Sequence, residues 1–203
     1  MSVSQQEDYI YIRYSEVIKP LLADLELRGK GYKIPRNCLN EIRAINDHIA
    51  RCYRKECINR TIEYNKAEGH LQRLAFDCFK QLNLSLFDKI ERCEKRYFSN
   101  LWLYWDKGEF WGTYLALRKK ATKSSIEAKK NETLNADVAM KHYEETYCCY
   151  CEIEALLNEN NRRLKWSFVV KWFMLAVKGG NWLLTTFLLS LVAAIISVLI
   201  GLL

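Results

Sequence analysis

The sequence predicts an all-α fold: a helical bundle, then an interfacial helix and one C-terminal transmembrane helix. Only 2 prolines and 8 glycines occur among 203 residues, so little in the chain interrupts helices. Apolar side chains recur at helical spacing, without the alternation that marks half-buried strands. The chain also ends in a long uncharged apolar run. These observations divide it into a helical domain over residues 1–160, a membrane-proximal segment over 161–180 and a membrane span over 182–203.

The first three helices are expected to form an up-and-down core. The first covers residues 5–27 with a kink at Pro20, the second begins after Pro35, and the third reaches Leu82. The inward-facing side chains of the first helix are expected to be Ile10, Tyr14, Val17, Ile18, Leu21, Leu22 and Leu25. Those of the second are Cys38, Leu39, Ile42, Ile45, Ile49, Cys52 and Tyr53. Those of the third are Ile58, Ile62, Ala67, Leu71, Leu74, Ala75, Cys78, Phe79 and Leu82.

Two segments of different composition follow these helices. Residues 97–114 are rich in aromatic side chains. They predict packing in a core or a subunit interface rather than a base-stacking platform, because Arg and Lys are sparse among them. Residues 118–130 are polar and basic, which predicts a mobile loop. Helical periodicity resumes over residues 138–157.

With 31 Lys and Arg against 24 Asp and Glu, the chain has a net charge of +7. Such a surface suits RNA, anionic lipid or an acidic partner, and charge alone does not choose among them. The first residues are polar and acidic, so we expect no signal peptide, and we expect the 8 cysteines to be reduced. Cys148, Cys149 and Cys151, with His142 upstream, lack a second well-spaced ligand pair. We therefore expect them to be buried apolar side chains, with no metal and no cofactor.

The most apolar segment runs from Trp182 to Leu203 without a charge, and as a helix it is about 33 Å long at ~1.5 Å per residue. That length matches a hydrocarbon core about 30 Å thick. The nearest basic residues all lie upstream, at Arg162, Arg163, Lys165, Lys171 and Lys178. The positive-inside rule therefore predicts a single-pass protein, in contact with membrane lipid, whose N-terminal domain is cytoplasmic.

Residues 166–177 form a second apolar segment that is too short to cross a bilayer. We expect a helix lying in the interface, with Trp166, Trp172 and Trp182 as anchors at the headgroup level. Gly179 and Gly180 supply a hinge between this helix and the span.

Small and hydroxyl-bearing side chains share one face of the predicted span, among them Thr186, Ser190 and Ser197. One interpretation is close packing between helices. The other is a ring of several copies that turns these hydroxyls toward a water-filled lumen. Because one span cannot line a pore alone, the second interpretation requires a homo-oligomer.

One pair of residues has the chemistry of a catalytic site. The second helix contains Arg43 and His48 as an R-x4-H pattern, in which His could move a proton and Arg could stabilise phosphorane charge during RNA cleavage. The alternative is an exposed helix face on which Arg43 pairs with Asp47. Five residues of helix rotate by about 500°, which leaves Arg43 and His48 about 140° apart. A composite site then needs the long Arg side chain to wrap around, a distorted helix or a second subunit.

The segments LNEIRAINDHIARCY and KAEGHLQRLAFDCFKQL resemble the two core helices of the HEPN superfamily, over residues 35–82. The resemblance implies an all-helical bundle, in whose nuclease members an R-x4-6-H motif cleaves RNA without a metal, usually in dimers. Ala44 departs from the commonest form of the motif, which has a polar residue after the Arg.

Together with the apolar tail, these helices are similar to the single-span accessory proteins of type VI-B CRISPR loci, which are encoded beside an RNA-guided RNA nuclease. That resemblance implies a ring-shaped homo-oligomer, an octamer, in the bacterial inner membrane. It also implies a functional link to the nuclease, in which a membrane pore strengthens antiviral interference after RNA targeting.

Three functions follow as hypotheses. In the first, tail helices line a pore with Thr186, Ser190 and Ser197 in the lumen, and Arg43 and His48 support assembly or gating. In the second, the chain is a membrane-tethered ribonuclease in which Arg43 and His48 are catalytic. In the third, it is an anchored scaffold that recruits a partner. Only the second hypothesis requires direct RNA binding.

Overall fold

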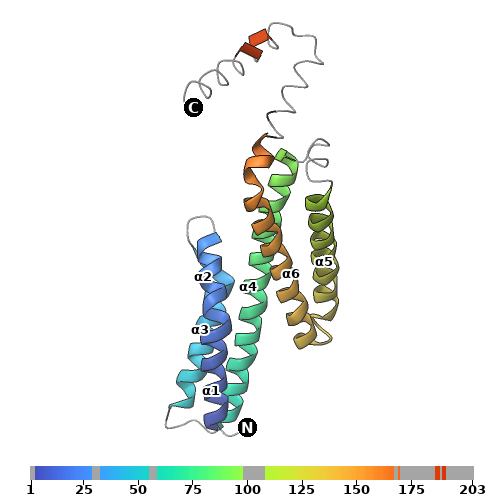
Figure 1. Cartoon of the computed structure of the whole chain (residues 1–203). Coiled ribbons are helices and arrows are strands. Elements are labelled where there is room, and N and C mark those ends of the chain that lie inside the picture. The colour runs from blue at the N-terminus through green and yellow to red at the C-terminus, as the bar shows by residue number, and fades with distance from the viewer. Residues whose placement is uncertain are drawn as a thin grey trace. The chain divides into compact units, whose positions relative to one another are not determined.

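A computed structural model describes residues 3–28, 33–54, 59–97 and 108–166, together with 169, 186, 187, 189 and 190. All regular elements in this part of the chain are helical (Figure 1). They are α1 (Val3–Arg13), the π-helix η1 (Tyr14–Ile18), α2 (Lys19–Arg28), α3 (Arg36–Cys52), α4 (Arg60–Tyr97), α5 (Glu109–Asn131) and α6 (Ala136–Glu159). The chain divides into two compact units, Met1–Lys89 with Ala116–Ile153, and Ile90–Leu115 with Glu154–Leu203.

Where a kink was expected at Pro20, the chain has a π-helical turn just before the proline. The N–H of Lys19 bonds to the carbonyl of Tyr14, five residues back. In a regular α-helix the Pro20 ring would clash with the carbonyl of the residue four positions earlier, and the wider turn relieves that clash. The extra residue in the turn also rotates the preceding side chains about the helix axis, relative to a regular α-helix. Tyr14 and Val17, both expected to face inward, are each 37% exposed, whereas Ile18 is fully buried.

The second helix begins where expected, because Pro35 precedes α3 in an extended conformation with φ −58° and ψ 144°. α3 buries Cys38, Ile45 and Cys52, which are spaced by seven residues and so form one narrow stripe. Leu39 and Tyr53 were expected on the same face. They are 48% and 61% exposed, because each follows a buried residue and points about 100° away from it.

The third helix is longer than expected, since α4 continues beyond Leu82 to Tyr97. Its predicted stripe is confirmed from Ala67 onward, but Ile62 is 49% exposed. The buried side chains of α4 in the core are Tyr64, Ala67, Leu71, Leu74, Ala75, Phe76, Cys78, Phe79 and Leu82. Side chains from α1, α2, α3, α5 and α6 complete this core. The first unit is therefore a helical bundle with α4 at its centre.

Residues 118–130 are helical and not a loop, because they form the C-terminal half of α5. Ala121, Ser124 and Ala128 recur at helical spacing and are 0%, 3% and 0% exposed. These small side chains let α5 pack closely on its neighbours, while its lysines remain on the outer side. The loop prediction was therefore wrong. The basic side chains form the solvated face of a packed helix and do not indicate an unstructured segment.

The fold class needs a correction in its membrane part. Among the residues that the structure describes, no helix is both long and apolar enough to cross a bilayer. The described helices are long, but charged side chains occur along each of them; α4, of 38 residues, is an example. The result is an all-α fold whose described helices are amphipathic and pack against one another.

Several predictions for the C-terminal segments lie outside the described residues, namely those for Trp172, Gly179, Gly180, Trp182 and Ser197. Trp166 is described and is 64% exposed at the end of the helical residues that follow α6. Of the residues expected in a span, Ser190 donates its hydroxyl to the carbonyl of Phe187 at 2.7 Å, and Thr186 is helical.

Candidate functional site

Two of the three histidines in the chain meet between α3 and α4. The rings of His48 and His70 are stacked, with centroids 5.2 Å apart and planes inclined by 24°. Their side chains are 13% and 21% exposed, so each ring is largely buried but reaches the surface. His48, expected as a catalytic residue, therefore has a histidine partner from the other helix.

Each imidazole is held by a glutamate of the opposite helix. His48 Nδ1 lies 2.8 Å from Glu63 Oε2, and His70 Nδ1 lies 2.7 Å from Glu41 Oε2. The ammonium of Lys66, followed by His48, lowers the pKa of Glu63 to about 2, so this carboxylate is ionised at neutral pH. An ionised carboxylate only accepts hydrogen bonds, so we assign a proton to Nδ1 of each ring. Nε2 is then the nitrogen left for chemistry.

Two arginines extend this arrangement. Arg51 Nη1 lies 3.6 Å from Glu63 Oε2, and Arg73 Nε lies 3.4 Å from Glu41 Oε2. Arg73 Nη2 also lies 2.9 Å from Nδ1 of His70, but because that nitrogen donates to Glu41 we assign the arginine to the carboxylate. The side chains of Arg51 and Arg73 are 51% and 60% exposed. Positive charge therefore borders the solvent-facing edge of the histidine pair.

The site arises from a short internal repeat that the sequence analysis missed. Residues 41–51 and 63–73 share the pattern E-x6-H-x2-R, which begins again 22 residues later. Seven helical residues rotate by about 700°, close to two full turns, so the glutamate and histidine of each copy share one face. α3 and α4 are antiparallel, and each glutamate therefore meets the histidine and arginine of the other copy. Searching for repeated spacings of polar residues would have found it.

Arg43 does not join this cluster. It is exposed on α3, and no hydrogen bond or ion pair links it to His48, to Asp47 or to any other residue that the structure describes. Because the two residues lie about 140° apart around the helix, His48 faces α4 and Arg43 does not. Arg43 and His48 as a catalytic pair stay a prediction, whereas His48 and His70 are in direct contact.

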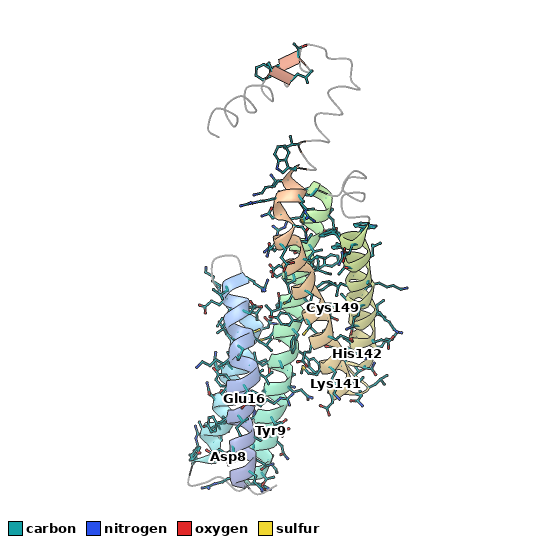
Figure 2. All side chains as sticks on the ribbon, in the orientation of Figure 1. Asp8, Tyr9, Glu16, Lys141, His142 and Cys149 are labelled. Atoms are coloured by element: carbon teal, nitrogen blue, oxygen red, sulfur yellow. The ribbon has the colours of Figure 1, made fainter. Side chains whose placement is uncertain are left out.

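The three cysteines on α6 were expected to be buried, and the structure confirms this for Cys149 but not for Cys148 or Cys151. Cys149, labelled in Figure 2, is buried, whereas its neighbour Cys148 is exposed and Cys151 is partly exposed. Burial raises the pKa of the Cys148 and Cys149 thiols, which disfavours the thiolate that a metal would need. Within the described residues, no three His, Cys, Asp or Glu side chains gather as metal ligands.

The third histidine takes part in a different contact, between α5 and α6. The Ser124 hydroxyl donates to Glu145 Oε2 at 2.6 Å and lies 3.1 Å from His142 Nδ1. In a nucleophilic triad the serine proton would point to the histidine and the acid would hold the far side of the ring. Here the serine is 3% exposed and its proton goes to the acid, so this contact ties two helices together.

Comparison with known proteins gave no match: no family model fits the chain, and neither a curated protein nor a solved structure is similar to it. What the fold and the site define is an all-helical bundle protein with a pair of carboxylate-bound imidazoles. The resemblance to HEPN proteins and to CRISPR accessory proteins stays a prediction.

Proposed function

We propose that the chain is an endoribonuclease in which His48 and His70 act as general base and general acid. The observation that supports this proposal is the pair of stacked imidazoles, each with Nδ1 held by a carboxylate and Nε2 left available. A carboxylate on Nδ1 fixes the tautomer and stabilises the imidazolium that forms when Nε2 takes up a proton. Two such rings supply one proton acceptor and one proton donor within a single site.

The reaction that suits this pair is transphosphorylation of RNA. One neutral imidazole removes the proton of the ribose 2′-hydroxyl, whose oxygen attacks the adjacent phosphorus. The other, protonated imidazole gives its proton to the 5′-oxygen as that P–O bond breaks, which leaves a 2′,3′-cyclic phosphate and a 5′-hydroxyl. Arg51, Lys66 and Arg73, which border the site, offset the negative charge on the phosphorane.

The pore and scaffold hypotheses are not part of this proposal. The pore hypothesis rests on residues 182–203, most of which lie outside the described residues, and it stays a prediction. The scaffold hypothesis gives no reason for two histidines to share carboxylate and arginine partners so regularly. The proposal therefore changes the expected pair from Arg43 and His48 to His48 and His70.

The test uses the purified full chain and a fluorogenic RNA oligonucleotide in EDTA. His48→Gln and His70→Gln should each lower the cleavage rate by about 10²-fold or more, and the double variant should be little worse than either alone. A 2′-deoxy substitution at the cleaved position should abolish the reaction, and the product should end in a cyclic phosphate. The rate should also show a bell-shaped pH dependence.

The control variant is His142→Gln, because His142 is the remaining histidine in the chain and lies on another helix. Its cleavage rate should equal that of the wild type. Two results would contradict the proposal: no cleavage of any RNA by the wild type, or cleavage that survives both the His48 and the His70 substitution.

A further inference from the structure

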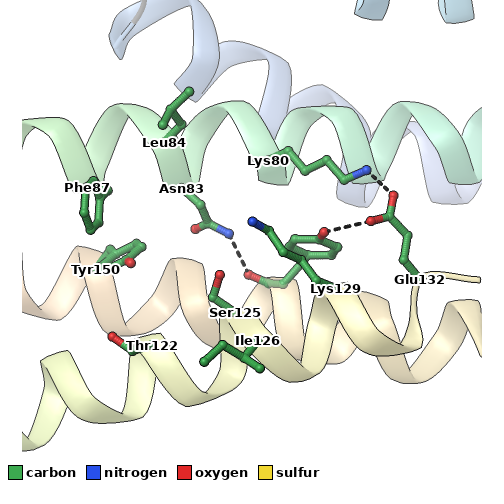
Figure 3. Close-up of a pocket in the computed structure, with 11 residues that line it drawn as sticks. Lys80, Asn83, Leu84, Phe87, Thr122, Ser125, Ile126, Lys129, Glu132 and Tyr150 are labelled. Atoms are coloured by element: carbon green, nitrogen blue, oxygen red, sulfur yellow. Dashed lines mark hydrogen bonds and ion pairs between the residues drawn. The ribbon is translucent and has the colours of Figure 1, made fainter.

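A groove of about 740 Å³ lies on the first unit, where α4 and α5 flank α6 (Figure 3). None of its lining residues belongs to the histidine site on α3 and α4. Leu84 and Ile126 line it and are 56% and 50% exposed, so apolar surface faces solvent on both α4 and α5. A volume of this size is in the range of small-molecule sites.

The character of the groove changes along its length. Phe87 and Tyr150 lie at one end, edge to face with centroids 6.3 Å apart, and Arg118 stacks 4.5 Å from the centroid of Phe87. The ion pair of Lys80 and Glu132 lies at the other end (Figure 3). An aromatic end and a charged end are thus joined by one continuous groove.

Asn83 lies between these ends and has an unmet hydrogen-bonding requirement. The residue is 9% exposed, and its Nδ2 donates to the main-chain oxygen of Tyr143 at 3.2 Å. Its Oδ1 is buried without a hydrogen-bond partner among the described residues. Leaving a buried acceptor without a donor is costly and uncommon in native proteins. A donor from outside the chain would satisfy it.

The charged end holds a second cation, Lys129, whose charge also acts on Glu132. Lys80 is already paired with Glu132, but the exposed Lys129 forms no direct ion pair with any residue that the structure describes. Ser125 lies one helical turn before Lys129 on α5, and both line the groove. A hydroxyl and an ammonium on one helix face are suited to an anionic group.

We propose that this groove binds a nucleoside monophosphate, with the base against Phe87 and Tyr150, a ribose hydroxyl donating to Asn83 Oδ1, and the phosphate at Ser125 and Lys129. Such a ligand presents an aromatic ring, a donor and an anion in the order in which the groove requires them. Because Asn83 Oδ1 is shielded from solvent, binding of this ligand requires a lining side chain to change rotamer. The proposal is independent of the ribonuclease site, because the two share no residue.

The test is isothermal titration of the full chain with adenosine and uridine 5′-monophosphates, and separately with adenosine and with inorganic phosphate. Lys129→Glu and Asn83→Leu should each weaken nucleotide binding by about tenfold or more. Adenosine alone and phosphate alone should each bind at least about tenfold more weakly than the nucleotide, since each fills half of the groove.

Lys119→Glu is the matched control, because Lys119 is an exposed lysine on the same helix that does not line the groove. Its affinity should equal that of the wild type. Lys129 is exposed, so its substitution leaves folding intact even if Asn83→Leu does not fold. The proposal is overturned if neither nucleotide binds at millimolar concentration, if phosphate alone binds as tightly, or if Lys119→Glu weakens binding as much as Lys129→Glu.

Discussion

His48 and His70 each contact two other functional groups while remaining partly open to solvent. Each has a carboxylate on Nδ1 and the other imidazole on its face. The two His–Glu pairs reach the surface with side chains 13–22% exposed, and solvent screening weakens ion pairs there. Their contribution to the stability of the bundle is modest and measurable, and their regular geometry fits a functional role.

The ionisation of Glu63 gives a prediction about acid stability. Its pKa in the folded protein is about 2, below the usual 4.5, chiefly because Lys66 and then His48 bond to it. A carboxylate with a lowered pKa stabilises the fold above its unfolded pKa, and that contribution is lost as the pH falls through the folded pKa. Wild type should therefore be more stable than Glu63→Gln at pH 7, and the difference should shrink between pH 4.5 and about 2.

Urea denaturation followed by circular dichroism across this pH range measures the difference. Glu68→Gln serves as the control, because Glu68 is exposed on the same helix and lies outside the cluster. A difference between wild type and Glu63→Gln that stays constant down to pH 2 would contradict the assigned contacts of Glu63.

Among the helices, apolar periodicity predicted the buried side chains well where a wide face of the helix is buried. It predicted them less well at the edges of a narrow buried face. The stripe of α4 from Ala67 to Leu82 was predicted because most of that face is buried. On α3, Ile42 and Ile49 pack against the core as predicted, whereas Leu39 and Tyr53, next to buried cysteines, were placed inside although they are exposed. The π-turn before Pro20 was not predictable from a period of 3.6 residues, because it inserts one residue into the register.

The π-turn gives a prediction about the first helices. Deleting the exposed Glu16 should convert η1 to a regular α-helical turn and keep Ile10 and Leu21 facing the core. Pro20 would then clash with the preceding turn, at a cost of about 3 kcal/mol. Combining the deletion with Pro20→Ala should recover most of that loss.

Denaturant unfolding of the deletion, the single substitution and the combination measures this coupling. If the deletion costs as much in the Pro20→Ala variant as in the wild type, the proline is not the reason for the π-turn.

At the scale of the whole bundle, the histidine site forms only where α3 and α4 pack against each other, so the sequence of either helix alone does not reveal it. Arg43 and His48 were predicted from α3 alone, because both lie within a few residues of each other on that helix. The partner of His48 is 22 residues away on α4 and is brought close by antiparallel packing. All-α architecture was predictable from composition and spacing, whereas the cross-helix contacts required the register between helices.

Tyrosine-to-carboxylate hydrogen bonds join distant helices of the first unit. Tyr64 donates to Glu7 at 3.1 Å, and Tyr147 donates to Asp24 at 2.7 Å, which connects α4 to α1 and α6 to α2. Tyr143 donates to Glu132 at 3.1 Å. Burial, followed by the carboxylate in the case of Tyr143, raises the pKa of each of these phenols above the usual 10. These bonds need the protonated phenol, so the bundle should lose stability in alkali.

Tyr143 allows the sharpest test of this alkaline sensitivity. Its pKa is raised to about 12, so the stabilisation from the neutral phenol is complete below the unfolded pKa near 10 and is lost as the pH rises toward 12. Tyr143→Phe keeps the ring against Phe76 and removes only the hydroxyl, at a cost of about 1 kcal/mol near pH 8. The stability difference between wild type and this variant should shrink as the pH rises from about 10 to about 12.

Tyr11→Phe, at a 50% exposed position, should follow the wild type throughout. Urea unfolding at each pH measures both differences, and a Tyr143→Phe difference that does not change with pH would show that the Glu132 bond does not tie α6 to the end of α5.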